Sequence, residues 1–142
     1  MRIDCALLCD SVTIREGLLH ILGGGITRAN REEFPAPLNL ALALRIMVHP
    51  TEAEHTHELA VMLLAEDGQR IAELGIQFGI NEPSALEPAE EASLPIALSL
   101  HTVLLPHEGP YSFELLIDGI HQGTVPFRAV KLEGAAEGQL EE

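Results

Sequence analysis

Large apolar residues alternate with small or polar residues along much of the chain. Between Leu38 and Val48 every even position holds Leu, Ile or Val, and Ala41, Ala43, Arg45 and Met47 stand at odd positions. Successive side chains of a strand point to opposite faces, so this period of two predicts a strand with one face toward a core. Leu and Ala also favour helices, but the strict alternation and the flanking prolines favour the strand.

The same period recurs in several further segments. It is present in residues 59–63, 72–80, 94–100, 111–117 and 125–129. Two pairs of these segments are joined by Asp-Gly dipeptides (67–68 and 118–119), which are strong hairpin signals.

The front of the chain predicts another hairpin, from residues 3–12 and 17–24, joined around Arg15-Glu16-Gly17. Together these patterns predict about eight strands and no convincing helix. We therefore expect a single antiparallel β-sandwich, either a jelly roll or an immunoglobulin-like Greek key. Residues 1–132 form this domain, and the Glu- and Gly-rich residues 133–142 are expected to form a flexible acidic tail.

Charge narrows the class of partner. The chain has 142 residues, with 8 Lys and Arg against 22 Asp and Glu, and a net charge of −14. Eight of the acids lie in residues 82–92 and 133–142, which read as a loop and a tail. Nucleic acids and anionic membranes are bound through clustered Lys and Arg, so neither is expected as a partner.

The first residues do not resemble a signal peptide, because Asp4 stands where the apolar region of a signal peptide should begin. Cys5 and Cys9 lie about 13 Å apart if their segment is extended, too far for a disulfide between them. Alternation places both on one apolar face, which favours buried thiols over a catalytic nucleophile. Two free thiols fit a reducing compartment, so we expect a cytoplasmic protein.

A family resemblance is carried by short motifs spread over residues 2–131. They are Cys9-Asp10, residues 17–24 (GLLHILGG), Phe34-Pro35, Asp67-Gly68, residues 109–113 (GPYSF), residues 117–119 (IDG) and Pro126-Phe127. In these motifs the chain resembles a family of small bacterial β-sandwich proteins of uncharacterised function. The resemblance implies a sandwich fold and a bacterial source, and it implies no catalytic residues.

His55-Thr56-His57 is the main candidate for metal chemistry. Residues i and i+2 of a strand share a face, so both imidazoles could reach one metal ion, with a third ligand from His49, His101 or Glu58. The pattern invites comparison with the cupins, but Val61 and Met62 stand where a ligand Glu is expected. The alternative is a polar loop that enters a strand.

Other candidates for chemistry have simpler interpretations. Asp67 and Asp118 fit turn chemistry, and Asp10 fits a local cap at a strand end. Gly23-Gly24-Gly25 has no following Gly-Lys-Ser/Thr, so a bulge or strand end is preferred to a phosphate loop. The seven histidines are scattered, which favours ordinary surface positions over a pH switch. No cofactor is predicted.

The residues opposite the large apolar rows are unusually uncharged. A solvated sheet face normally carries more charge, so an open face of this kind predicts a protein contact. The candidate interface residues are Ala41, Ala43, Ala60, Met62 and Ala97. The other possibility is that loops 26–37 and 81–92 cover this face.

These patterns predict a non-enzymatic structural or interaction module that acts by self-association, as a homo-oligomer, or by docking an unknown protein. The alternative is a small metal- or ligand-binding jelly roll that uses His55 and His57.

Overall fold

The computed structural model describes residues 1–132. They form twelve strands and two single-turn 3₁₀ helices, Pro50–Glu52 and Pro83–Ala85. The strands are β1 (Arg2–Cys9), β2 (Ser11–Arg15), β3 (Leu18–Leu22), β4 (Arg28–Arg31), β5 (Ala36–Pro37), β6 (Ala41–Val48), β7 (His57–Ala65), β8 (Arg70–Phe78), β9 (Ala92–Ser99), β10 (Leu104–Leu105), β11 (Gly109–Ile117) and β12 (Ile120–Lys131).

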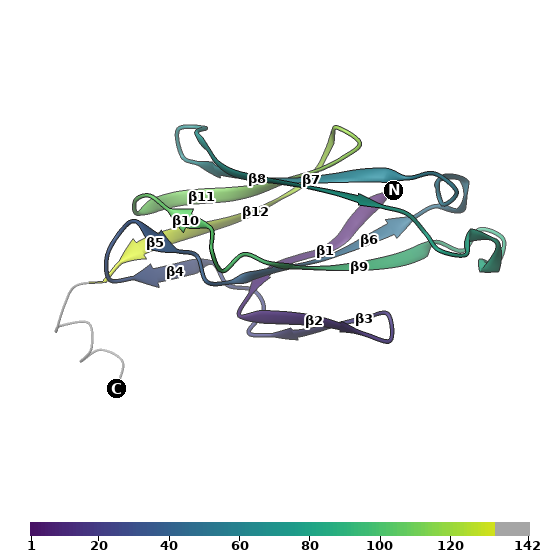
Figure 1. Ribbon diagram of the computed structural model, residues 1–142, viewed down its shortest axis with the longest axis horizontal. Helices are drawn as coiled ribbons and strands as arrows, with labels where there is room; N and C mark the ends of the chain where they lie inside the picture. Colours follow the sequence, from purple (N-terminus) through teal and green to yellow (C-terminus); the bar gives the residue numbers. More distant parts are fainter. Residues whose placement is uncertain (133–142) are drawn as a thin grey trace.

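Two sheets form the body of the fold (Figure 1). The smaller sheet has the antiparallel order β1-β6-β9, and the larger has the order β4-β12-β11-β7-β8. The larger sheet is mixed, because β4 runs parallel to β12 while its other pairs are antiparallel. The pairs β5-β10 and β2-β3 are separate two-stranded ribbons.

The core lies between the two sheets. Leu42, Leu44 and Ile46 of β6 are fully buried, and the side chains of Phe113 and Leu115 of β11 are at most 2% exposed. They belong to one continuous apolar cluster to which both sheets contribute. Burial of a side chain of this size contributes about 1.5–3 kcal/mol, so the alternating apolar rows stabilise the face-to-face arrangement.

The tight turns form where residues tolerate a left-handed backbone. Glu16 and Gly17 have φ of 55° and 74°, and Asp118 and Gly119 have φ of 51° and 81°. Two successive positive φ values characterise the type I′ turn, which matches the twist of a hairpin. The predicted turns at Glu16-Gly17 and Asp118-Gly119 are therefore confirmed, and Asp67-Gly68 also joins a hairpin, β7-β8.

The hairpin β2-β3 forms a third layer on the outer side of the smaller sheet (Figure 1). Val12, Leu19 and Ile21 of the hairpin pack against a second buried cluster made of Cys9, Ala41 and Ala43. The smaller sheet is consequently buried on both faces around Ala41 and Ala43, while Arg45 and Ser93 farther along its outer side are exposed.

The all-β prediction is confirmed, but three of its details were wrong. The described residues contain twelve strands and not about eight, because residues 3–12 divide into β1 and β2 and because β4, β5 and β10 are too short for alternation to reveal. The parallel pair β4-β12 breaks the expected antiparallel arrangement. Residues 3–9 pair with β6 instead of joining the first hairpin, which is limited to β2 and β3. The predicted tail, residues 133–142, lies outside the described residues.

Candidate functional site

The outward side of the larger sheet is the principal candidate site. In β7 and β11 the residues that point away from the core alternate with buried ones, whereas in the edge strand β8 only Phe78 is buried. No other layer of the described chain covers them (Figure 1). We call this surface the open face; its residues are Glu58, Ala60, Met62, Leu64, Arg70, Glu73, Gly75, Gln77, Pro110, Ser112, Glu114 and Leu116.

The centre of the open face is apolar. Ala60 pairs with Leu116, and Met62 and Leu64 follow at the same side of β7. All four are partly exposed, although side chains of their size are more often inside. Ala60 and Met62, which the sequence predicted as interface residues, therefore lie on an accessible surface, and their role in an interface stays a prediction.

A hydrogen-bonded polar cluster crosses the open face beside Met62. The Glu114 carboxylate accepts hydrogen bonds of 2.7 Å from the hydroxyls of Ser112 and Thr124, and its Oε1 lies 2.7 Å from His121 Nε2. Burial alone would raise the pKa of Glu114, but the bonds from Thr124, Ser112 and His121 hold it below its ordinary value. Glu114 thus stays ionised and already satisfied within its own sheet.

Four charged residues lie on the open face, three acids and one arginine. Arg70 and Glu73 form an ion pair of 2.7 Å, which leaves Glu58 as an acid of this face without a cationic partner among residues 1–132. The chain as a whole carries a net charge of −14. The open face therefore carries a net charge of −2, from Glu58 and Glu114.

The other predicted interface residues lie on the smaller sheet, and here the prediction needs correction. Ala41 and Ala43 are 4% and 0% exposed beneath the hairpin β2-β3, so they are not available to a partner. Ala97 pairs with Ala43 on the same outer side and is partly exposed. The cover is the hairpin, not loops 26–37 and 81–92 as the alternative supposed.

The prediction that His55 and His57 share a strand face was wrong. β7 begins at His57, and His55 lies in the preceding bend. Both ring nitrogens of His57 are engaged, Nδ1 at 2.7 Å from Asp118 Oδ2 and Nε2 at 2.8 Å from the carbonyl oxygen of Glu52. The Glu52 carbonyl, and then Asp118, raise the pKa of His57 against the effect of burial.

These contacts give His57 a structural role, because its ring joins the start of β7 to the β11-β12 turn. Within residues 1–132 no group of three or more His, Cys, Asp and Glu side chains is arranged to hold a metal ion. His49 and His101, the suggested further ligands, bond Thr51 and Asn39 instead.

Asp67, Asp118 and Cys9 have the local roles that the sequence indicated, whereas Cys5, which was expected to be buried, is partly exposed. Asp67 accepts a hydrogen bond from the Gln69 N–H at 2.9 Å, and Asp118 accepts one from the Glu58 N–H at 3.0 Å. Both cysteines are free thiols, and burial, reinforced by the neighbouring Asp10, raises the pKa of Cys9. A thiol with a raised pKa is a poor nucleophile at neutral pH.

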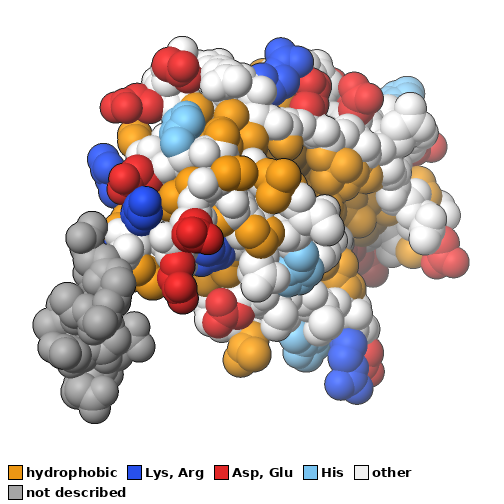
Figure 2. Space-filling view, turned by 60° about the vertical axis from the view of Figure 1, so that its left-hand side comes forward, with side chains coloured by type: hydrophobic (Ala, Val, Ile, Leu, Met, Phe, Trp, Pro, Cys, Tyr) orange, Lys and Arg blue, Asp and Glu red, His pale blue; other side chains and the backbone are white. Residues whose placement is uncertain are grey.

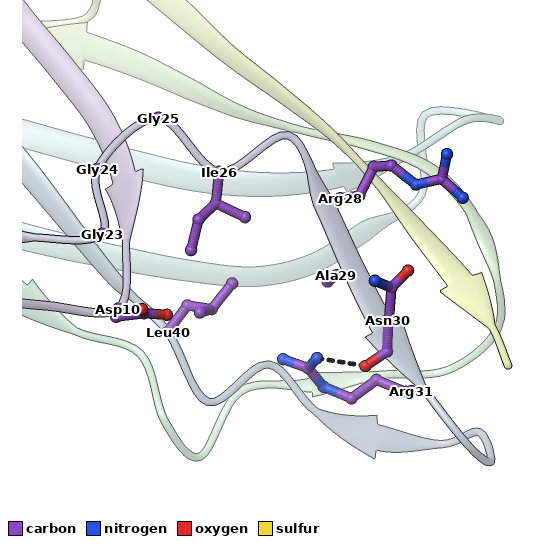
Figure 3. A pocket seen from close by; sticks show the side chains of 10 residues that line it. All are labelled: Asp10, Gly23, Gly24, Gly25, Ile26, Arg28, Ala29, Asn30, Arg31 and Leu40. Atoms are coloured by element: carbon purple, nitrogen blue, oxygen red, sulfur yellow. Dashed lines mark hydrogen bonds between the residues drawn. The ribbon is translucent and has the colours of Figure 1, made fainter. Parts of the chain in front are cut away.

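A surface hollow of about 510 Å³ brings together two features that are separate in the sequence, Asp10 and the run Gly23–Gly25 (Figure 3). Gly23 has a φ of +66°, and a Cβ there would lie 2.5 Å from Asp10 Oδ2. At the other side Arg31 donates to the carbonyl oxygens of Asn30, Pro37 and Leu38. The glycines therefore allow the hairpin to attach closely to β1, and Arg31 is occupied by backbone.

Sequence reasoning missed the Glu114 cluster and the neighbouring arginines Arg28 and Arg128. Alternation along β11 places Glu114 on the outward side and was sufficient to find it. Arg28 and Arg128 are 100 positions apart in the chain, and only the parallel pairing of β4 with β12 brings them together.

Comparison with known proteins places the chain in a family. It belongs to the family of unknown function DUF6941, whose model matches residues 4–130. This confirms the predicted resemblance to a family of uncharacterised function. No curated protein matches the chain.

Among solved structures, the chain is similar to the Pseudomonas fluorescens alkylpurine DNA glycosylase AlkC bound to DNA containing an abasic site analog. The identity is 9% and the TM-score 0.45; the match covers 91% of this chain and 30% of the glycosylase chain. The chain thus spans less than a third of that protein. No helix in residues 1–132 is long and apolar enough to cross a membrane.

Proposed function

We propose that this member of DUF6941 is a non-enzymatic, cytoplasmic interaction module that forms homodimers through its open face. The observation that supports this proposal is that the outer side of one sheet is covered by the chain itself and the outer side of the other is not. The chain uses its own hairpin to cover the outer side of the smaller sheet, including Ala41 and Ala43. It leaves Met62, Leu64 and Leu116 of the larger sheet partly exposed.

The size of the open face suits a dimer. The three strands β7, β8 and β11, spaced about 4.8 Å apart and about nine residues long, span roughly 450 Å² in projection. A specific interface buries about 800 Å² on each partner, which is the same order. Two such faces can pack back to back, as the sheets of sandwiches do.

A second copy is an occupant that the charges of the open face permit. Arg70 and Glu73 neutralise each other, and Glu114 is satisfied by its own neighbours. Two copies would therefore meet at this face with a net charge of −2 each, a small part of the net charge of −14 on the chain. A basic partner would gain more from the acidic surfaces elsewhere on the chain.

Sedimentation velocity over protein concentrations from about 1 to about 100 μM tests the proposal in the range where specific weak dimers form. The wild-type chain is expected to move from monomer toward dimer. Met62→Glu places an unpaired charge at the centre of the interface, and it should leave the chain monomeric throughout.

Leu22→Glu is the matched control. Leu22 is 68% exposed on the hairpin, outside the open face, so its substitution should leave dimerisation unchanged. A wild-type chain that stays monomeric at the highest concentration would overturn the proposal. Loss of the dimer in Leu22→Glu but not in Met62→Glu would move the interface to the hairpin.

A further inference from the structure

The basic residues of this acidic chain are unevenly distributed. The sequence holds eight Lys and Arg, and four of them lie on the paired strands β4 and β12. These are Arg28, Arg31, Arg128 and Lys131. Figure 2 shows Lys and Arg side chains gathered close to where the described chain ends, with acidic side chains among them.

The parallel register places Arg28 directly beside Arg128. The next pair, Ala29 and Ala129, is buried toward the core, so the two arginines point to the outside. Both are exposed. Their strands lie about 4.8 Å apart, and like charges at such neighbouring positions repel each other. An anion bound between them would relieve this repulsion.

Neither arginine has a carboxylate partner within residues 1–132. The arginines that form ion pairs there are Arg2, Arg45 and Arg70. Arg31 is held by backbone carbonyls, whereas the guanidinium groups of Arg28 and Arg128 form no hydrogen bond in this part of the chain. Their donors are available, and Asn30 presents an exposed amide next to Arg28.

We propose that Arg28, Arg128 and Asn30 bind an acidic peptide segment of a partner protein. A guanidinium group matches a carboxylate with two parallel hydrogen bonds, and two adjacent groups can hold successive carboxylates of an extended peptide. The amide of Asn30 adds a neutral donor. The surface hollow that Arg28 and Asn30 line provides room beside the arginine pair.

A short acidic peptide fits this site better than a nucleic acid. Glu32 and Glu33 follow Arg31 directly, and the net charge of −14 repels a long polyanion. A short peptide needs only the local arginine pair. The inference does not rest on dimerisation, because the arginine pair lies toward the β4 edge, beyond the apolar centre of the open face.

Titration of hexaglutamate into the ¹⁵N-labelled full chain, followed by NMR, tests the site. We expect chemical-shift changes on β4 and β12 and an affinity that falls with added salt. The double variant R28Q/R128Q should weaken binding by about fivefold or more, as expected for the loss of two exposed charge contacts.

Arg15→Gln is the matched control, because Arg15 is also an arginine without an ion pair in residues 1–132 but stands alone on the hairpin. It should not change the affinity. Equal losses in R15Q and R28Q/R128Q, or no binding of hexaglutamate, would overturn the site. The same titration of Met62→Glu separates this result from dimerisation, since that variant should still bind.

Two further outcomes would overturn the choice of occupant. The first is tighter binding of a single-stranded oligonucleotide than of hexaglutamate. The second is a gain in hexaglutamate affinity when Glu133, Glu137, Glu141 and Glu142 are all replaced by Gln, which would assign the site to the chain's own acidic end.

Discussion

The outer sides of the two sheets differ in the residues between their apolar rows. On the smaller sheet, Ala41, Ala43 and Cys9 are small and uncharged, and the hairpin lies directly on them. On the larger sheet, Met62 and Leu116 are interleaved with polar groups such as Glu114. The comparison teaches that small residues mark a sheet face covered by the chain itself, whereas larger apolar residues among satisfied charges mark a face left open.

The most direct test of this difference is to place the same charge on the outer side of each sheet. Ala43→Arg puts a guanidinium under the hairpin, where the native side chain is 0% exposed. An uncompensated buried charge costs about 3–5 kcal/mol of the free energy of unfolding. Urea denaturation measures this loss.

Ala60→Arg on the open face is its matched partner. The guanidinium can reach water there, so the change should be within about 0.5 kcal/mol at concentrations where the chain is monomeric. Similar losses for the two variants would mean that the sides are equally covered, which contradicts the distinction.

A second test concerns how the hairpin is attached. Gly23→Ala adds a Cβ at 2.5 Å from Asp10 Oδ2 at a φ of +66°, whereas Gly17→Ala meets no atom within 4 Å at a φ of +74°. Left-handed backbone costs a non-glycine residue about 1–2 kcal/mol, so both variants lose stability. Gly23→Ala should lose more in denaturant unfolding; equal losses would show that the close approach to Asp10 is unimportant.

The smallest effect concerns the end of the larger sheet, where His57 and Asp118 join β7 to the β11-β12 turn. Asp118→Asn keeps the positive φ of the turn, which Asn tolerates, and removes the charge. Because Asp118 is 45% exposed, we expect a loss of about 1 kcal/mol or less in the free energy of unfolding.

The loss should depend on pH. The raised pKa of His57 means that its contribution is complete below its ordinary pKa of about 6.5 and disappears as the pH rises through the raised value. The Glu58 N–H, and then His57, lower the pKa of Asp118, so its contribution disappears below about pH 4. Wild type and variant should therefore differ most between about pH 4 and 6.5. A difference that is constant with pH would refute the ion-pair interpretation.

Alternation along the chain was sufficient to predict the long strands, because a row such as Leu42, Leu44 and Ile46 is a local pattern, and the Asp-Gly and Glu-Gly dipeptides indicated the turns between neighbouring strands. These local patterns could not predict how strands that are distant in the sequence pair. The hairpin's position over Ala43 and the pairing of Arg28 with Arg128 depend on contacts between distant segments. For the same reason Ala41 and Ala60 looked alike in the sequence, although one is buried and the other accessible.

Methyl NMR with a soluble paramagnetic agent measures the accessibility of both regions in the unmodified chain. As the protein concentration rises through the dimerisation range, the Met62 methyl group should become protected, while the Leu22 methyl groups on the hairpin should stay accessible. Protection of Leu22 with an unchanged Met62 would contradict the assignment of the open face as the interface.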